Sequence, residues 1–208
     1  MLKRNTSAPS TRTTGARNCV AAAIGALLLA SHAPGLAAIV DESGEAVAKL
    51  APTKDSNAAG TATFSSAGKD GVRITIEVSG LKPGSEHGWH VHEKGDCSAP
   101  DATSAGGHFS LQGQQHGPQE GDKYHAGDLG NLKADAQGKA SKTLLVPDSK
   151  LTLASGPASV VGKAVIVHGG PDDLKSQPSG NSGPRIACGV VERQAAKGGT
   201  LPAKPPAK

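Results

Sequence analysis

The chain is short of aromatic residues, of cysteine and of long apolar runs. Of its 208 residues only four are aromatic (one Trp, one Tyr and two Phe), whereas 28 are Gly and 14 are Pro. So few aromatic residues argue against nucleobase stacking, and this Gly and Pro content argues against a helical bundle. A core must therefore be built from Val, Ile, Leu and Ala, and the length suffices for one domain with additional segments.

The first residues have the pattern of a secretory signal peptide. Residues 1–37 contain four basic residues and no acid, and include an uninterrupted small and apolar run over 20–30. This run is shorter than the about 20 apolar residues that a membrane-spanning helix needs, and the small residues before position 38 suit a signal peptidase. We therefore expect residues 1–37 to be a cleaved signal, with no stable membrane insertion after cleavage. An uncleaved amphipathic anchor is the alternative.

The positive charge of the chain is concentrated at its two ends. The sequence has 22 Lys and Arg against 18 Asp and Glu, so loss of the four cations of the signal leaves a neutral chain. Residues 195–208 contain three lysines, no acid and few apolar groups, and we expect a disordered basic tail there. The expected folded domain, residues 38–194, is then net acidic, which argues against nucleic-acid binding.

Cysteine usage agrees with export. Cys19 lies within the expected signal, so the exported chain keeps only Cys97 and Cys188. An even number of cysteines in an oxidising compartment favours one disulfide bond between them. Two buried free thiols are the alternative.

Hydrophobic periodicity along the body is two rather than 3.6. The segment 72–78 alternates apolar and polar residues without a fault, as expected for a strand with one face in a core. Weaker runs predict further strands at 46–50, 61–64, 89–92, 141–146, 160–168 and 186–191. No helix of ordinary length is predicted. Seven or eight short strands imply an antiparallel sandwich or barrel with two long turn-rich segments, 93–127 and 169–185.

Seven histidines remain after removal of the signal, and six of them occur in a context that suits metal binding. His90 and His92 are two apart on a predicted strand, so their imidazoles project from the same face. A carboxylate and three further histidines follow in a glycine-rich loop, at spacings of 8, 9 and 3 residues: His108, His116, His125 and Asp128. His168 ends a distant apolar strand. Three imidazoles with one carboxylate suit zinc, and an all-imidazole set suits copper(II).

Five segments of the chain resemble the copper/zinc superoxide dismutases, and specifically their exported bacterial members. The motifs are GWHVHEKGDC at 88–97, SAGGHF at 104–109, HAGDLGNL at 125–132, VIVHGGPDD at 165–173 and GNSGPRIACGV at 180–190. The similarity spans about 40–191, nearly the whole predicted domain. It implies an all-β fold, a flattened eight-stranded Greek-key β-barrel with two long functional loops, and a periplasmic location.

The resemblance also implies the ligands of one copper and one zinc per subunit. The residues at the copper positions are His90, His92, His108 and His168. Those at the zinc positions are His108, His116, His125 and Asp128. His108 would then bridge both metals through its two ring nitrogens, which requires an imidazolate. Asp172 matches a carboxylate that accepts from one ligand of each metal, His90 and His116. Cys97 and Cys188 match the family's disulfide pair.

The implied reaction is the dismutation of superoxide to dioxygen and hydrogen peroxide, which would protect the cell envelope. Copper alternates between two oxidation states, whereas zinc has no redox chemistry and is structural and electrostatic. His108 is expected to leave copper and take up a proton when copper is reduced. Arg185, three residues before Cys188, matches the arginine beside the copper and would orient the superoxide anion by hydrogen bonds.

Several alternatives stay open from the sequence. A zinc-only hydrolase or binding module is one rival, although Asp128 closes the zinc shell and leaves no position for a catalytic water. A copper carrier or an inactive dismutase-like domain is the other. His87 falls on the strand face opposite His90 and is expected to be structural or exposed. Lys175 either steers substrate or is simply solvated, and the chain is either a monomer or a homodimer.

Overall fold

The computed structural model describes residues 44–121 and 123–194, which lie in one compact unit of the chain. Eight strands make up this part: β1 (Ala46–Pro52), β2 (Ala59–Ser66), β3 (Val72–Ser79), β4 (Glu86–His92), β5 (Asp128–Lys133), β6 (Ala140–Val146), β7 (Ala164–His168) and β8 (Arg185–Arg193). The expected signal peptide, 1–37, and the expected tail, 195–208, lie outside the described residues.

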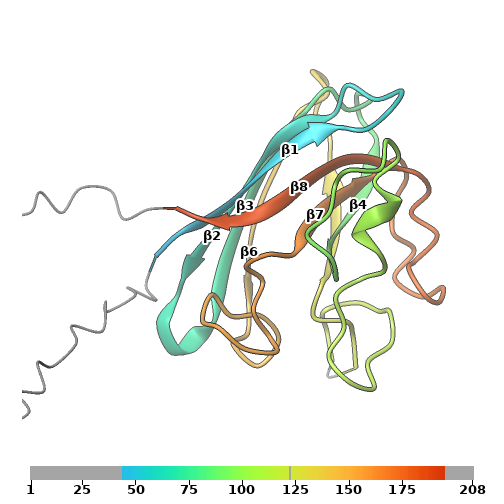
Figure 1. Cartoon of the computed structure of the whole chain (residues 1–208). Helices are drawn as coiled ribbons and strands as arrows, with labels where there is room; N and C mark the ends of the chain where they lie inside the picture. Colours follow the sequence, from blue (N-terminus) through green and yellow to red (C-terminus); the bar gives the residue numbers. More distant parts are fainter. Residues whose placement is uncertain (1–43, 122, 195–208) are drawn as a thin grey trace, which may run out of the picture. The chain divides into compact units, whose positions relative to one another are not determined.

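The strands form one antiparallel sheet in the order β5-β4-β7-β8-β1-β2-β3-β6. Figure 1 shows β8, β1, β2 and β3 lying side by side along this sheet. The two edge strands, β5 and β6, face each other across a seam without backbone pairing. Counted across this seam, the β3–β4 connection passes over β6 and β5, and the β6–β7 connection passes over β5 and β4. Such connections are a Greek-key arrangement. The predicted all-β, eight-stranded Greek-key barrel is confirmed.

The core follows from the alternation of apolar and polar residues. The even positions of β3, from Val72 to Val78, are at most 3% exposed, and its odd positions point outward. The largest buried side chains are Trp89 on β4 and Phe64 on β2, both fully inaccessible to solvent. Small and branched aliphatic residues fill most of the remaining interior, as the scarcity of aromatic residues requires.

The structure differs from the predicted strands at two places. β5, Asp128–Lys133, was not among them, because its sequence contains two turn-forming residues, Gly130 and Asn131, and shows no clean alternation. The predicted strand over 160–168 is a strand only from Ala164, since residues 161–162 form a turn.

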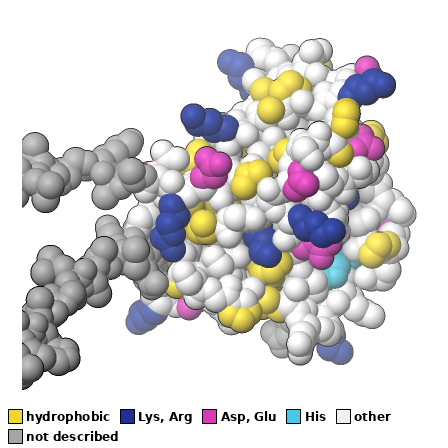
Figure 2. Space-filling model, in the orientation of Figure 1, with side chains coloured by type: hydrophobic (Ala, Val, Ile, Leu, Met, Phe, Trp, Pro, Cys, Tyr) yellow, Lys and Arg dark blue, Asp and Glu magenta, His cyan; other side chains and the backbone are white. Residues whose placement is uncertain are grey.

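Helical structure in the described residues is limited to two short 3₁₀ turns, Gly68–Asp70 and Thr103–Ala105. Within 44–121 and 123–194, no helix is long and apolar enough to span a membrane. On the face drawn in Figure 2, basic side chains are interspersed with acidic ones and do not merge into one patch.

The predicted disulfide bond is present between Cys97 and Cys188, whose Cα atoms are 5.9 Å apart. It ties the long loop after β4 to β8 across 91 residues of sequence. Beside it, Ala102 and Ala105 of the loop pack on Ile166 of β7 and form a small second apolar cluster. The disulfide therefore fixes the loop against the outer face of the sheet.

Replacing Cys97 with serine should lower the free energy of unfolding by about 2–5 kcal/mol, because the unfolded chain loses a long covalent loop. Denaturant unfolding of oxidised protein measures this, and Ser98→Ala, at the exposed neighbouring position, is the control. An unchanged midpoint in Cys97→Ser would contradict the assigned role of the bond.

Candidate metal centre

The two histidines of β4 are presented together because a strand alternates its side chains. Trp89 and Val91 point into the barrel core, so His90 and His92 project from the opposite face. The long loop 93–127 covers that face, and His90 and His92 are at most 1% exposed. β7 pairs with β4 and brings His168 to the same face.

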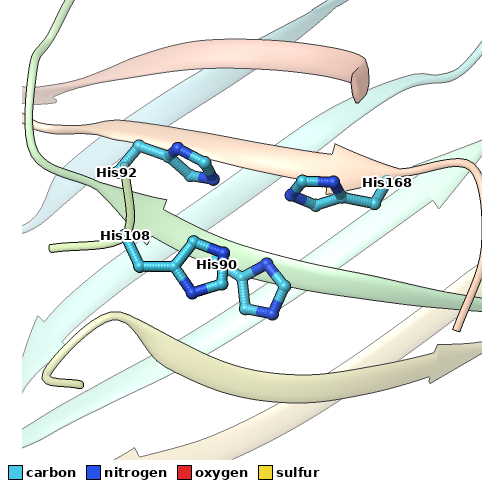
Figure 3. Close-up of side chains that lie close together, drawn as sticks. All are labelled: His90, His92, His108 and His168. Carbon is cyan, nitrogen blue, oxygen red and sulfur yellow. The ribbon is translucent and has the colours of Figure 1, made fainter. Parts of the chain in front are cut away.

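Four imidazoles converge on this face: His90, His92, His108 and His168. Figure 3 shows their rings turned toward a common space, with His92 and His168 facing each other across it. One nitrogen of each ring is buried without a hydrogen-bond partner: His90 Nδ1, His92 Nε2, His108 Nε2 and His168 Nε2. Buried polar atoms are nearly always satisfied, so four orphaned nitrogens within 4.8 Å of one another are explained by a metal ion.

The other ring nitrogen of each histidine is fixed by a hydrogen bond. His92 Nδ1 donates to the Gly106 carbonyl (3.0 Å) and His168 Nδ1 to the Gly183 carbonyl (3.2 Å). These bonds select the tautomer in which the free nitrogen carries a lone pair. Burial lowers the pKa of His90 to about 4 and that of His168 to about 3, so both rings are neutral at pH 7 and able to bind a metal.

A second cluster is built around one oxygen of Asp128. The Oδ1 atom lies 2.8 Å from His108 Nδ1, 3.0 Å from His116 Nδ1 and 3.4 Å from His125 Nδ1. Its Oδ2 atom accepts hydrogen bonds from the backbone amides of Gly117 and His125, which aims Oδ1 at the three rings. Zn–N distances of 2.0–2.1 Å place tetrahedral ligands about 3.3 Å apart, so these spacings suit zinc.

His108 is the residue common to both clusters. Its Nδ1 faces Asp128 and its Nε2 faces the all-imidazole group, where its ring stacks on that of His90 with centroids 3.9 Å apart. Burial lowers the pKa of His108, so the ring carries no extra proton at neutral pH. One imidazole is therefore available to two metals.

Asp172 connects the two clusters from the other side. Its Oδ2 accepts from His90 Nε2 and its Oδ1 from His116 Nε2, each at 2.8 Å. Burial by itself would raise the pKa of this carboxyl, but the bonds to His116 and His90 hold it well below its usual range. Burial likewise disfavours a charged His116, yet its bonds to Asp128 and Asp172 raise its pKa to about 9.

Two residues that the sequence analysis did not single out complete this arrangement. Asn131 makes two hydrogen bonds with the backbone of Asp172, one through each atom of its amide. Gly180 passes so close to the Asp172–His116 hydrogen bond that no side chain fits there. The HAGDLGNL motif contains Asn131, but nothing local indicates its partner 41 residues away.

His87 was expected to be either structural or exposed, and the structure shows that it is buried and structural. Its Nδ1 donates to the backbone carbonyl of His168 (2.7 Å), and its Nε2 lies 2.6 Å from the hydroxyl of Ser85. The side chain is 3% exposed and belongs to neither metal cluster. It therefore supports the backbone from which His168 projects.

Arg185 lines a cavity of about 420 Å³ that opens onto His92, His108 and His168. Its guanidinium donates to the backbone carbonyls of Ala102 and Gly106, each at 2.6 Å. Two of its five N–H donors are thus occupied, and the cation is held at the mouth of the imidazole cluster. Lys175 is exposed on the loop between β7 and β8.

Comparison with known proteins gives consistent results. The model of the family "Copper/zinc superoxide dismutase (SODC)" matches residues 58–191. A "Superoxide dismutase [Cu-Zn]" from Cordyceps militaris is 44% identical over 144 residues, 66% of this chain and 91% of that protein. The protein of the same name from Neurospora crassa is 43% identical with the same coverage.

Solved structures agree with the sequence relatives. The clock protein EA4 is 36% identical with a TM-score of 0.65, over 73% of this chain and 95% of that one. A double mutant of a SOD-like protein from Bacillus subtilis is 37% identical with a TM-score of 0.63, over 70% and 96% of the two chains. With the family model matched over most of the barrel, the chain belongs to the copper/zinc superoxide dismutase family.

Proposed function

We propose that the chain disproportionates superoxide at a dinuclear centre, with two superoxide anions and two protons giving one dioxygen and one hydrogen peroxide. The observation that carries this proposal is the set of four unpartnered imidazole nitrogens that adjoins the Asp128 cluster and shares His108 with it. Family membership supports it, since the relatives named above are copper/zinc superoxide dismutases.

The two ligand sets follow from the chemistry of the side chains. Copper would be held by the all-imidazole group, His90, His92, His108 and His168, and zinc by His108, His116, His125 and Asp128. Copper, when bound, supplies the one-electron exchange that superoxide needs, whereas zinc has no redox chemistry. Asp172 would hold one ligand of each metal in a fixed tautomer.

His108 and Arg185 would act on the substrate. With a metal bound at each of its nitrogens, His108 would carry no ring proton, and Nε2 is the atom that would take up a proton and pass it to the reduced product. Arg185 keeps N–H donors free after its two bonds to the loop backbone, so it can bind and orient an oxygen anion in the cavity.

The protein would act in the cell envelope as an exported bacterial-type enzyme. The signal-like pattern of residues 1–37 and the disulfide support this proposal, because stable disulfides form in oxidising compartments. The mass of protein recovered from the periplasm tests it. Cleavage near position 37 is expected, and retention of the full-length chain in the cytoplasm would contradict export.

Replacing Arg185 with isoleucine should leave both metals bound and cut the rate with superoxide by about tenfold, the low end of the range for electrostatic steering. The remaining rate should also depend less on salt, because one screened charge is gone. Rapid kinetics at several ionic strengths measure both effects. Arg73→Ile, on the exposed face of β3, is the control. A wild-type rate in Arg185→Ile would show that Arg185 does not guide the substrate and would make Lys175 the next candidate.

The proposed function is tested directly by product stoichiometry. Protein loaded with copper and zinc should accelerate the conversion of superoxide into equal amounts of dioxygen and hydrogen peroxide above the spontaneous rate, whereas protein loaded with zinc alone should give no acceleration. Accelerated consumption of superoxide without dioxygen release would indicate a reductase, and no acceleration by copper-loaded protein would indicate a carrier or binding domain.

A further inference from the structure

Lys142 is a lysine on the inward-facing side of a barrel strand. β6 alternates so that Ala140, Leu144 and Val146 face the interior, and Lys142 shares their side of the strand. It is partly buried, and burial lowers its pKa because the ammonium loses water. It takes part in none of the ion pairs found among residues 44–121 and 123–194. An apolar residue would fill this position at a lower cost in solvation.

The ammonium of Lys142 spans the seam between the two sheet edges. β5 and β6 are not paired by backbone hydrogen bonds, and Lys142 Nζ donates across the gap to the backbone carbonyl of Asn131 on β5 (3.0 Å). This bond links the strands at Asn131, whose side chain binds the backbone of Asp172. It therefore fixes the backbone of β5 at Asn131.

The side chain of Asn131 in turn fixes the backbone of Asp172. Its Oδ1 accepts from the Asp172 amide (2.7 Å), and its Nδ2 donates to the Asp172 carbonyl (2.9 Å). Two bonds from one planar amide define both the distance and the orientation of the residue they hold. The Asp172 carboxylate then holds His90 and His116, one from each cluster.

We propose that Lys142 is a positioning residue for the metal centre, acting through Asn131 on Asp172. The inference rests on the proposed ligand assignment, in which His116 binds zinc and His90 binds copper. An inward-pointing charge at a sheet edge also discourages pairing with other chains. Protection of the sheet edge alone predicts no effect on metal retention, so a measurement of metal retention distinguishes this role from positioning of the metal centre.

The test compares zinc release from Lys142→Met, Lys142→Arg and wild type, all loaded with copper and zinc, using a chromogenic chelator. Methionine keeps the length of the side chain without a donor, and arginine keeps a donor and the charge. Lys133→Met is the matched control, because Lys133 lies on β5 but forms an exposed ion pair with Glu86. We expect about tenfold faster release from Lys142→Met, the low end of the effect of outer hydrogen-bond partners of ligands. Lys142→Arg should release zinc at nearly the wild-type rate.

Two further measurements separate positioning from general loosening. The copper(II) electron paramagnetic resonance spectrum should change in Lys142→Met and return in Lys142→Arg, because Asp172 also holds His90. The melting temperature of metal-free Lys142→Met should equal or exceed that of wild type, since a partly buried ammonium has been removed. A Lys142→Met, Asn131→Ala double variant should release zinc no faster than Asn131→Ala alone.

Several results would overturn the inference. One is zinc release from Lys142→Met that is unchanged, or accelerated no more than in Lys133→Met. Another is additive acceleration of zinc release in the double variant. The last is faster zinc release from Lys142→Met that accompanies a lower metal-free melting temperature and is not restored in Lys142→Arg. If wild type itself retains no zinc, the proposed function fails. If wild type retains both metals but Lys142→Met behaves like the control, only this inference fails.

Discussion

Replacing Gly180 with alanine is expected to leave the barrel folded and to reduce zinc affinity by more than about 100-fold. The new Cβ would overlap Asp172 Oδ1 and lie 2.5 Å from His116 Nε2, so the bond between these two side chains could not form. Loss of an outer hydrogen-bond partner of a ligand typically costs about 10- to 100-fold in metal affinity, and here the ligand itself is also displaced. Zinc content after dialysis against a weak chelator measures the effect.

A matched control separates this collision from backbone strain. Gly180 has φ +68, a conformation that alanine adopts only with strain. Gly84 has nearly the same φ, +72, but nothing lies within 4 Å of a Cβ built there. Gly84→Ala should therefore lose some stability and keep its zinc. Full zinc retention in Gly180→Ala would show that Asp172 does not position His116.

Replacing His108 with alanine should impair both metal sites and reduce the rate with superoxide by more than about 100-fold. No other residue of the described chain belongs to both clusters, so its loss removes one nitrogen from each. The effect should exceed that of losing an outer partner, because a direct ligand is removed. Metal content and the rate with superoxide, measured on the same sample, test this.

His125→Ala is the informative comparison for this variant. His125 belongs to the Asp128 cluster alone, so its removal should weaken zinc binding and leave copper in place. Equal losses of copper in the two variants, or retention of both metals in His108→Ala, would contradict the proposed bridging role of His108.

The fold could be predicted from the sequence where one strand face is buried. β3 shows perfect alternation, and all its apolar positions lie in the core. β5 could not be predicted in this way, because its pairing with β4 compensates for a glycine at φ +78 and a sequence rich in turn-forming residues. Long-range hydrogen bonding overrode local preference there.

The residues of the candidate site likewise divide into those that the sequence predicts and those that it does not. His90 and His92 could be grouped from strand geometry alone. His168 was a candidate at the end of an apolar strand, and the resemblance assigned it to copper and supplied Asp172. Asn131, Lys142 and Gly180 went unrecognised, because their significance depends on contacts between segments distant in sequence. Asparagine and glycine in a loop are ordinary turn residues, and a lysine on a short strand resembles a solvated one. Only the closed arrangement of β5, β6 and the loop after β7 shows what each contacts.

Elemental analysis of wild-type protein loaded with copper and zinc, then freed of loosely bound metal, tests the central claim most directly. In the proposed assignment, seven side chains supply eight ligand positions because His108 is used twice, so we expect one copper and one zinc per chain. Zinc alone, copper alone, or two equivalents of one metal under saturating amounts of both would contradict the dinuclear copper/zinc centre.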